Sequence, residues 1–294
     1  MSTTYRGRNM LRHVGRCIYC YAGPEQVQLT DEHVVPFSLG ADSYLKEASC
    51  PDCQKVTRDF ETHLARNVFG HLRIHIGVQT RHPQQRPTEL PTRIVRAGQE
   101  QRVSLPIGDH PNFLVIPIWE SPGALRGEPP QAGFSGLAAH LYHQVPPTTG
   151  AALGLQHAEA VEIRPEYRVE TNQFARAIAK IGYCQAVAIL GLDGFRPLAI
   201  RDVILGKYTG ISQFVGSHLT LPPPPFQSGN QHMITIYDAW ITPHLRLVLA
   251  AVRLFADSGT RDHGLPIYTV VVGSPITKGL IKSLPATTRP RPRL

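Results

Sequence analysis

The longest hydrophobic pattern in the chain runs from Ala177 to Leu192, where apolar side chains occupy almost every position. Around its start, Phe174, Ile178 and Ile181 recur at intervals of three and four residues, the spacing of one face of an α-helix. Thr171 stands where a helix N-cap is expected. The pattern predicts a helix that begins near Thr171 and lies at the centre of a core, because it is apolar nearly all round.

Three further segments combine apolar and β-branched residues: Phe113–Trp119, Leu245–Phe255 and Ile267–Val272. The first predicts a strand, and Pro117 places it towards the edge of a sheet because proline has no N–H to donate. The other two are compatible with strands or with turns of a buried helix. This part of the chain is therefore expected to be mixed in secondary structure and rich in strands.

The composition changes between residues 80 and 92, where three prolines lie among mainly polar residues. Each proline disfavours helix for itself and for the residue before it, so this segment predicts an extended linker. The linker divides the chain into a first domain over residues 1–79, a mixed α/β domain over residues 93–274 and a basic tail over residues 275–294. The predicted fold class is α+β.

The charge of the chain indicates a class of binding partner. The 294 residues include 30 Lys and Arg against 22 Asp and Glu, which gives a net charge of +8. Residues 1–16 contain arginines and no acid, and no acid follows Asp262. Basic ends on a basic chain favour a polyanionic partner, most commonly nucleic acid, although they also serve solubility alone.

Composition also bounds the class of protein. Apolar residues make up 42% of the chain, enough to bury a sizeable core, which excludes a wholly disordered protein. No apolar run reaches the roughly 18 to 20 residues that a membrane span needs, so no membrane partner is expected. Residues 1–6 are not followed by an apolar stretch, which predicts no secretory signal and a cytoplasmic location.

The cysteines fall into two close pairs and one single residue, Cys184. An odd number of cysteines without a secretory signal argues against a disulfide framework. Both pairs are C-x-x-C, and 29 residues separate them. Two such knuckles can direct four thiolates at one ion, which is the tetrahedral arrangement of structural zinc. The pattern predicts one zinc ion per chain, bound by Cys17, Cys20, Cys50 and Cys53.

The segment between the knuckles contains a second pattern, TDEHVVP over Thr30–Pro36. A carboxylate followed by histidine, two β-branched residues and proline, placed between two C-x-x-C knuckles, resembles the HNH endonucleases, which are ββα-metal nucleases. The resemblance covers the chain from about Cys17 to Arg66. It implies a small zinc-stabilised ββα-metal domain in which His33 is the general base and Glu32 binds a catalytic divalent cation, Mg²⁺ or Mn²⁺.

The second knuckle opens a segment with helical spacing. In the HNH family a His or Asn directly after the last cysteine is the second metal ligand, and Gln54 stands there in this sequence. At about 100° per residue, Gln54, Arg58 and Glu61 share one helix face. Glu61 can then substitute as the ligand and Arg58 can bind the scissile phosphate. A solvated face with an Arg58–Glu61 ion pair is equally compatible. Phe60 lies on the opposite, apolar side, and His63 lies nearer to that side.

Two functions are compatible with these features. The resemblance implies an endonuclease that hydrolyses phosphodiester bonds of double-stranded DNA with the help of the divalent cation. The alternative is a non-catalytic zinc module that binds nucleic acid or protein, its HNH site having decayed. Glu32 and His33 favour the enzyme, whereas Gln54 favours the module. Basic residues after the helix serve equally as a phosphate-binding surface or as a solvated face: Arg66, His71, Arg73, His75, Arg81 and Arg86.

Overall fold

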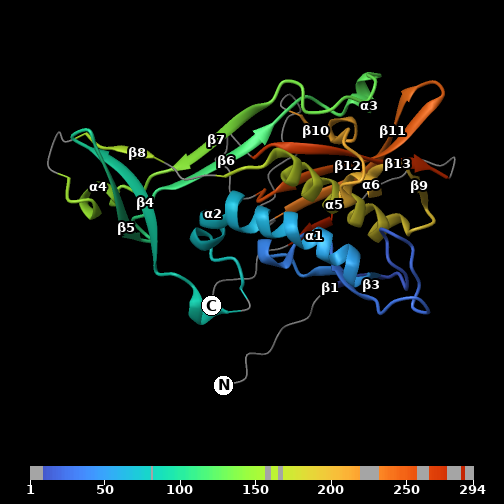
Figure 1. Cartoon of the computed structure of the whole chain (residues 1–294), viewed down its shortest axis with the longest axis horizontal. Helices are drawn as coiled ribbons and strands as arrows, with labels where there is room; N and C mark the ends of the chain where they lie inside the picture. The colour runs from blue at the N-terminus through green and yellow to red at the C-terminus, as the bar shows by residue number, and fades with distance from the viewer. Residues whose placement is uncertain are drawn as a thin grey trace.

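The computed structural model describes residues 9–80, 82–155, 160–164, 168–218, 232–256, 265–276 and 286–288. Helices and several sheets alternate along these residues, so the fold is α+β as predicted. A main body is built around one large sheet and one long helix. A smaller sheet is set apart at one end of the long axis (Figure 1).

The N-terminal part contains a small sheet followed by a helix. Strands β2 and β3 are antiparallel, and β1 joins β3 in parallel. Helix α1 follows β3 directly, which gives the order strand, strand, helix. The elements are β1 (Asn9–His13), β2 (Thr30–His33), the 3₁₀ turn η1 (Phe37–Leu39), β3 (Ser43–Ser49), α1 (Pro51–His63), the π-helical turn η2 (Leu64–Val68) and α2 (Gly70–His75).

Helix α1 begins where its sequence suits helix initiation. Pro51 lies in the first turn, where a missing N–H removes no hydrogen bond, and the sulfur of the N-cap Cys50 accepts from the Cys53 N–H at 3.5 Å. Phe60 is fully buried, whereas Arg58 is exposed. The helix therefore turns its apolar side to the core, which confirms the face assignment made from its spacing.

The C-terminal strands form the large sheet. Its strand order is β10-β13-β12-β11-β14, with β9 also paired to β13, and all of these pairs are antiparallel. Leu245–Phe255 and Ile267–Val272 contribute its two central strands, so both segments are strands and not helix turns. The elements are β9 (Phe195–Pro197), α6 (Ile200–Leu205), η4 (Ile211–Gln213), β10 (Val215–His218), β11 (His232–Thr242), β12 (Leu245–Leu254), β13 (Ile267–Pro275) and β14 (Ala286–Thr288).

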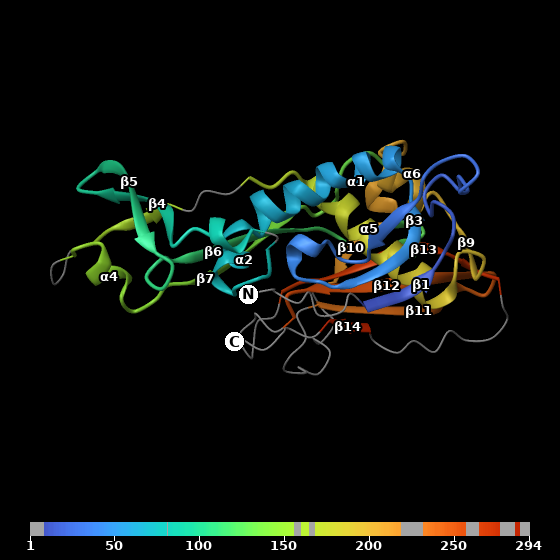
Figure 2. The same cartoon turned by 90° about the horizontal axis from the view of Figure 1, so that it is seen from below.

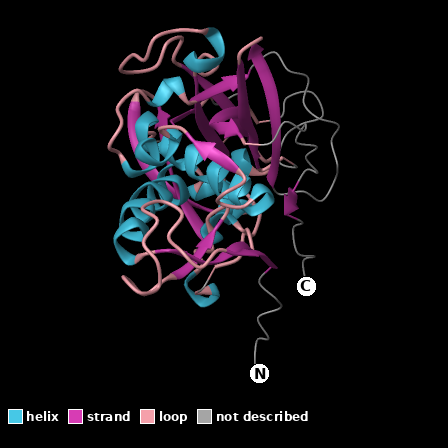
Figure 3. Cartoon of the chain, turned by 90° about the vertical axis from the view of Figure 1, so that its right-hand side faces the viewer, coloured by secondary structure: helices cyan, strands magenta, loops and turns pink. Residues whose placement is uncertain are grey.

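Helix α5 (Thr171–Leu190) lies between this sheet and α1 (Figure 2). The predicted central helix is thereby confirmed, and its N-cap is Glu170, one residue earlier than expected. Gly182 allows the close approach to the sheet, since a Cβ there would lie 3.0 Å from the Cβ atoms of Ala250 and Val270. Seen along the long axis, the helices lie mainly to one side of the large sheet (Figure 3).

Two smaller sheets extend away from α1 and α5. Strand β6, which contains Pro117, pairs with β7, and β4 pairs with β5 and β8. The strand predicted over Phe113–Trp119 is confirmed, and its sheet has two strands, so both are edges. The elements are η3 (Pro83–Gln85), β4 (Glu89–Arg96), β5 (Gln99–Pro106), β6 (Asn112–Ile118), α3 (Gly123–Arg126), β7 (Ala138–Gln144), α4 (Thr149–Ala152) and β8 (Glu162–Arg164).

The hydrophobic core continues past the predicted linker. Buried side chains between residues 17 and 78 belong to the same cluster as those between 174 and 272. Residues 89–92 of the predicted linker form part of β4, because burial of Leu90 and Thr92 outweighs the effect of the intervening proline. This end of the predicted extended linker is thus part of a strand. The division into separate domains stays a prediction, and the continuous core argues against independent folding.

Several sequence-based predictions concern residues outside the described part of the chain. These are most of the two basic ends, namely residues 1–8, 277–285 and 289–294, and Arg81. Within the described part, none of the helices has both the length and the apolar character that crossing a membrane requires.

His232 connects the large sheet to the N-terminal part through both ring nitrogens. The Phe255 N–H donates to Nδ1 at 3.2 Å, so Nε2 carries the proton and donates to the carbonyl of Leu39 at 3.0 Å. Burial lowers the pKa of His232 to about 4. A second proton on Nδ1 would face the Phe255 N–H, which explains why the neutral ring is favoured.

We expect the free energy of unfolding to fall as the pH decreases from about 6.5 towards 4. The pKa of His232 is lower in the folded protein than its ordinary value of about 6.5, so the unfolded chain binds the proton first in this window. A shift of this size corresponds to about 3 kcal/mol for a fully buried ring. Urea unfolding between pH 7.5 and 5.5, with zinc content checked at each pH, measures the slope.

His232→Gln should make this slope shallower by up to about 1.4 kcal/mol per pH unit. The exposed His244 provides the matched control, since His244→Gln should leave the slope unchanged. An unchanged slope in His232→Gln would mean that His232 is already charged in the folded protein.

Candidate active site and metal centre

The four cysteines of the two knuckles converge on one point. Their sulfur atoms all lie within 4.8 Å of one another, and Cys20 Sγ is 3.7 Å from Cys50 Sγ. Two sulfurs on one zinc ion, each about 2.3 Å from it, are about 3.8 Å apart in a tetrahedron. A disulfide would bring the sulfurs to about 2.0 Å. The predicted four-cysteine cluster is confirmed, and its geometry is compatible with one structural zinc ion.

Hydrogen bonding within the cluster favours the thiolate form of one cysteine. The Cys53 thiol donates to Cys17 Sγ, which lowers the pKa of Cys17 to about 4 although burial opposes the shift. The same hydrogen bond raises the pKa of Cys53 above its usual value. Thiolates are the ligands that zinc binds, so a dication here would relieve the repulsion that keeps the second proton on the cluster.

The first knuckle is held by the helices of the C-terminal half. Tyr183 Oη on α5 donates to the carbonyl of Ile18 at 2.7 Å, and Arg201 on α6 donates to the carbonyl of Tyr19 at 3.2 Å. The rings of Tyr19 and Tyr183 also pack together, with centroids 6.2 Å apart. Hydrogen bonds and ring packing therefore connect the cysteine cluster to helices α5 and α6.

A pocket of about 630 Å³ lies beside the cluster, between β2, the turn that follows it and the exposed face of α1. The five residues considered for catalysis or for the catalytic ion all line it: Glu32, His33, Gln54, Arg58 and Glu61. Glu32 and His33 are contributed by the end of β2, and the other three by successive turns of α1. The structure thus brings together residues that the sequence separates.

His33 is held between aromatic side chains. Its ring centroid lies 5.8 Å from that of Phe37 and 6.3 Å from that of Tyr44, its partner across the β2–β3 pair. Its main-chain carbonyl accepts a hydrogen bond from the ammonium of Lys180 on α5. The backbone and the ring of His33 are therefore both restrained by neighbouring groups.

Lys180 is the functional residue that the sequence analysis missed. Its Nζ lies 2.8 Å from Glu32 Oε1 and 2.8 Å from Glu61 Oε1. The side chain of Lys180 is fully buried, and that of Glu32 is 5% exposed. A sequence signal did exist, because Lys180 is the only charged residue between Ala177 and Leu192. A lone charge in so apolar a helix must be paired if it is buried.

The charges of this cluster are strongly coupled. Burial disfavours the charged ammonium, but attraction to Glu32 and Glu61 outweighs it, so the pKa of Lys180 lies above its ordinary value. Burial raises the pKa of Glu32, and repulsion from Glu61 adds to this effect while Lys180 opposes it. One ammonium thus compensates two carboxylates and leaves one excess negative charge.

The residues present do not fit the catalytic Mg²⁺ or Mn²⁺ implied by the family resemblance. Glu32 and Glu61 do converge, as a shared ligand role requires, but the group between them is the Lys180 ammonium. In the described part of the chain, the cysteine cluster is the group of three or more Cys, His, Asp or Glu side chains placed to share an ion. Gln54 offers only a neutral carbonyl.

The side chains around the Lys180 cluster lie in different surroundings. Glu61 pairs with Lys180 and not with Arg58, which is exposed. His63 is buried on the opposite side, where its Nε2 accepts from the Glu170 N–H at 3.0 Å and joins α1 to the start of α5. Asp31 accepts from the Glu47 N–H at 3.3 Å, so it supports the hairpin.

A second hollow of about 440 Å³ continues the pocket along η2 and α2. The two hollows share Ala65, Arg66, Arg73, Thr80 and His82, and Arg86 lines the second. Burial first, then repulsion from Arg86 and Arg66, lowers the pKa of Arg73. Mutual repulsion of this kind is relieved by a bound anion. We call the two hollows together the basic groove.

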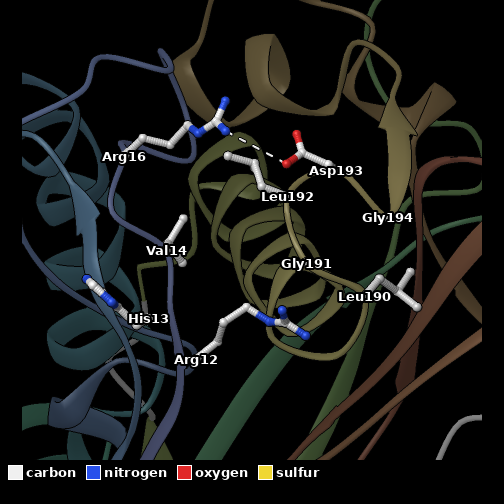
Figure 4. Close-up of a pocket in the computed structure, with 9 residues that line it drawn as sticks. All are labelled: Arg12, His13, Val14, Arg16, Leu190, Gly191, Leu192, Asp193 and Gly194. Atoms are coloured by element: carbon white, nitrogen blue, oxygen red, sulfur yellow. Dashed lines mark ion pairs between the residues drawn. The ribbon is translucent and has the colours of Figure 1, made fainter.

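A separate hollow at the C-terminal end of α5 has a structural role (Figure 4). The Arg12 guanidinium donates to the carbonyls of Ala188 and Ile189 at 3.0 and 3.1 Å, which caps the last turn of the helix. Arg16 faces Asp193 across this hollow at 3.7 Å. Two of the basic residues near the N-terminus therefore stabilise the fold.

No protein-family model, curated protein or solved structure matches the chain.

Proposed function

We propose that the pocket between β2 and α1 hydrolyses phosphodiester bonds of double-stranded DNA, as an HNH-type endonuclease with His33 as its general base. The observation that carries this proposal is the shared pocket, in which His33 lies with Arg58, Arg66 and Arg73. Phosphodiester hydrolysis needs a group that accepts a proton from water and cations that bind the phosphate.

The roles follow from the chemistry of each side chain. His33 takes a proton from the attacking water, whose oxygen forms the new bond to phosphorus. The bond from phosphorus to the leaving sugar oxygen breaks, and that oxygen receives a proton from the imidazolium or from solvent. Arg58, exposed on the pocket rim, stabilises the charge that develops on the phosphate oxygens. Phe37 and Tyr44 limit the rotation of the base.

The charge of the basic groove supports a polyanionic substrate. Lys180 offsets one of the two negative charges of Glu32 and Glu61, and the arginines outnumber the one that is left. Arg58 and Arg66 are exposed, and Arg73 is half-buried beside them. Several guanidinium groups in one groove offer the positive charge and the N–H donors that bind the oxygens of a phosphate backbone.

The alternative is a zinc module that binds nucleic acid without cleaving it. One observation favours it, namely that both carboxylates expected to bind the catalytic ion are held by Lys180. Gln54, in place of the family's His or Asn, is in keeping with this alternative. DNA binding without cleavage would identify this function.

The test uses the full-length protein with one zinc ion per chain and supercoiled plasmid as substrate. Endonuclease activity converts the plasmid to nicked or linear forms, which a gel resolves. Reactions are run without added divalent ion and with Mg²⁺ or Mn²⁺. They distinguish cleavage that needs a divalent ion from cleavage that does not. Plasmid that stays supercoiled in every reaction, while duplex DNA still binds, would replace the endonuclease proposal with the non-catalytic module.

DNA affinity should fall steeply with salt if the basic groove binds the backbone. Each phosphate neutralised on duplex DNA contributes about −0.9 to the slope of log K against log salt. Arg66→Ala and Arg86→Ala should therefore each reduce the slope by about 0.9, measured by fluorescence anisotropy of a labelled duplex. Arg102→Ala, on the exposed side of β5, is the control that should leave it unchanged. Equal slopes in all variants would show that DNA does not bind in the basic groove.

A further inference from the structure

We propose that the ammonium of Lys180 is the resident cation of the Glu32–Glu61 pair, and that the pocket therefore works without a divalent metal ion. Lys180 Nζ lies between the two carboxylates that the family resemblance assigns to the ion. The proposal rests on the proposed function, because it assigns the cation of the same pocket. It also makes a claim about ion binding that can be tested without any cleavage.

The surroundings of Nζ form a complete shell of oxygen atoms. Glu32 and Glu61 each contribute a carboxylate oxygen at 2.8 Å, and the carbonyls of His33 and Val34 also accept from it, the latter at 3.4 Å. Glu61 contributes through its charge, because its Oε1 forms an ion pair with Nζ and no hydrogen bond. Carboxylate and carbonyl oxygens are also the ligands of hard divalent ions, so the shell resembles a metal site in its chemistry.

The size of the shell fits an ammonium better than a magnesium ion. Both carboxylate oxygens lie 2.8 Å from Nζ, a normal distance for a charged N–H···O hydrogen bond. Mg²⁺ binds oxygen at about 2.0–2.1 Å. The carboxylates would have to move inwards around a smaller ion, and the lysine would have to leave.

Lys180 is enclosed by buried neighbours. Its side chain is fully buried, and its neighbours on α5, Ile181, Tyr183 and Cys184, are buried as well. Moving the ammonium out would leave the buried Glu32 carboxylate facing the partly exposed Glu61 carboxylate without a cation between them. Breaking a buried charge network by removing one partner carries a large free-energy cost. A divalent ion must offset that cost before it gains any net binding.

Lys180 is a positioning residue in this arrangement. It does not line the pocket, but its bonds to Glu32 and to the carbonyls of His33 and Val34 fix the end of β2. That segment carries the general base. The helix that supplies Lys180 is the central helix of the core, so the base is anchored to the most deeply buried helix of the protein.

The first test is a titration of the zinc-loaded wild-type protein with Mn²⁺, followed by the electron paramagnetic resonance signal of free Mn²⁺. We expect no Mn²⁺ to bind at the Glu32–Glu61 pair at millimolar concentrations. Glu61→Gln identifies the location of any ion that does bind. Binding in the wild type that Glu61→Gln weakens tenfold or more would overturn the proposal, whereas binding that it leaves unchanged lies elsewhere and agrees with an ammonium-filled site.

The second test removes the ammonium from between the two carboxylates. Lys180→Met removes the ammonium and should produce a new Mn²⁺ site at the two carboxylates. Lys55→Met, an exposed lysine of α1, is the matched control and should bind no additional ion. A folded Lys180→Met protein without a new Mn²⁺ site would show that the carboxylates do not form an ion-binding pair, and this would also overturn the proposal.

A double variant tests whether the uncompensated charge of Lys180→Met affects folding. Lys180→Met leaves two uncompensated carboxylates, while Lys180→Met with Glu61→Gln restores the wild-type excess of one negative charge. The double variant should fold and should bind no Mn²⁺. If Lys180→Met is unfolded, the wild-type titration alone decides the question.

The two proposals can fail separately. Lack of plasmid cleavage together with no Mn²⁺ binding removes the endonuclease function and leaves the assignment of Lys180 intact. Cleavage that requires Mg²⁺, with Mn²⁺ bound at Glu61, removes the assignment of Lys180 and leaves the endonuclease intact. Cleavage in metal-depleted buffer by protein that retains one zinc ion agrees with both.

Discussion

His33→Ala should lower the rate of plasmid cleavage by about 10²–10⁴-fold while leaving the zinc content and the affinity for duplex DNA nearly unchanged. This range is the usual contribution of a positioned general base, and it corresponds to about 3–5 kcal/mol of transition-state stabilisation. The imidazole accepts a proton only as water attacks phosphorus, so its loss should reduce kcat and not the binding of substrate.

The structure indicates that this variant keeps its fold. Lys180 bonds to the main-chain carbonyl of His33, which alanine retains, and the ion pair between Lys180 and Glu32 involves no side-chain atom of His33. Four cysteines bind the predicted zinc, so His33 is not required as a ligand. The change therefore removes the base and leaves its support in place.

Single-turnover cleavage and anisotropy measure the two effects separately. Added imidazole should restore part of the rate in His33→Ala, because a small base can enter the vacated space. His244→Ala, an exposed histidine outside the pocket, controls for general effects of losing a histidine. Zinc loss from His33→Ala would instead make His33 a structural ligand, and an unchanged rate would exclude it as the base.

Local features of this fold could be predicted from the sequence because they depend on short spacings. The two C-x-x-C pairs specify a sulfur cluster, since each knuckle brings its own two thiolates together. Helical periodicity places Gln54, Arg58 and Glu61 on one face of α1, and all three do line the pocket. These predictions require only residues that are neighbours within one element.

The contacts between distant segments could not be predicted in this way. Lys180 lies far along the chain from Glu32, and its pairing depends on how α5 packs beside β2 and α1. Both the apolar helix and the pair of carboxylates are visible in the sequence, but no pattern relates one to the other. A buried lysine needs an acidic partner, so an isolated lysine in an apolar helix is the signal to follow.

Whether residues 80–92 separate two domains could not be predicted either, because this also depends on contacts between distant segments. Composition over residues 80–92 indicates an extended segment, which agrees with β4 beginning at Glu89, but an extended segment does not by itself mark a boundary between domains. The core is continuous because α5 lies against both α1 and the large sheet. This packing arises from the complementary apolar faces of three distant elements. Composition within one segment carries no information about them.

Cys50→Ser should abolish both zinc binding and the cooperative fold, a larger loss of stability than that expected from His232→Gln. Cys50 serves twice, as a member of the sulfur cluster and as the N-cap of α1, whose sulfur accepts the Cys53 N–H. Serine can still cap the helix, so the substitution isolates the metal contribution. Structural zinc contributes about 10–16 kcal/mol in small zinc domains, which is comparable with the whole stability of a typical protein.

The continuous core determines how far this loss should spread. The knuckle carbonyls of Ile18 and Tyr19 are bound by Tyr183 and Arg201, so the metal site is tied to α5 and α6. We expect Cys50→Ser to lose the near-ultraviolet circular dichroism of the whole chain, to show no cooperative urea transition and to hold almost no zinc by elemental analysis. Cys184→Ala, which changes a buried cysteine outside the cluster, should retain its zinc and unfold near the wild-type midpoint. A variant that loses zinc while the large sheet keeps a separate, wild-type-like transition would establish two folding units divided near residue 80.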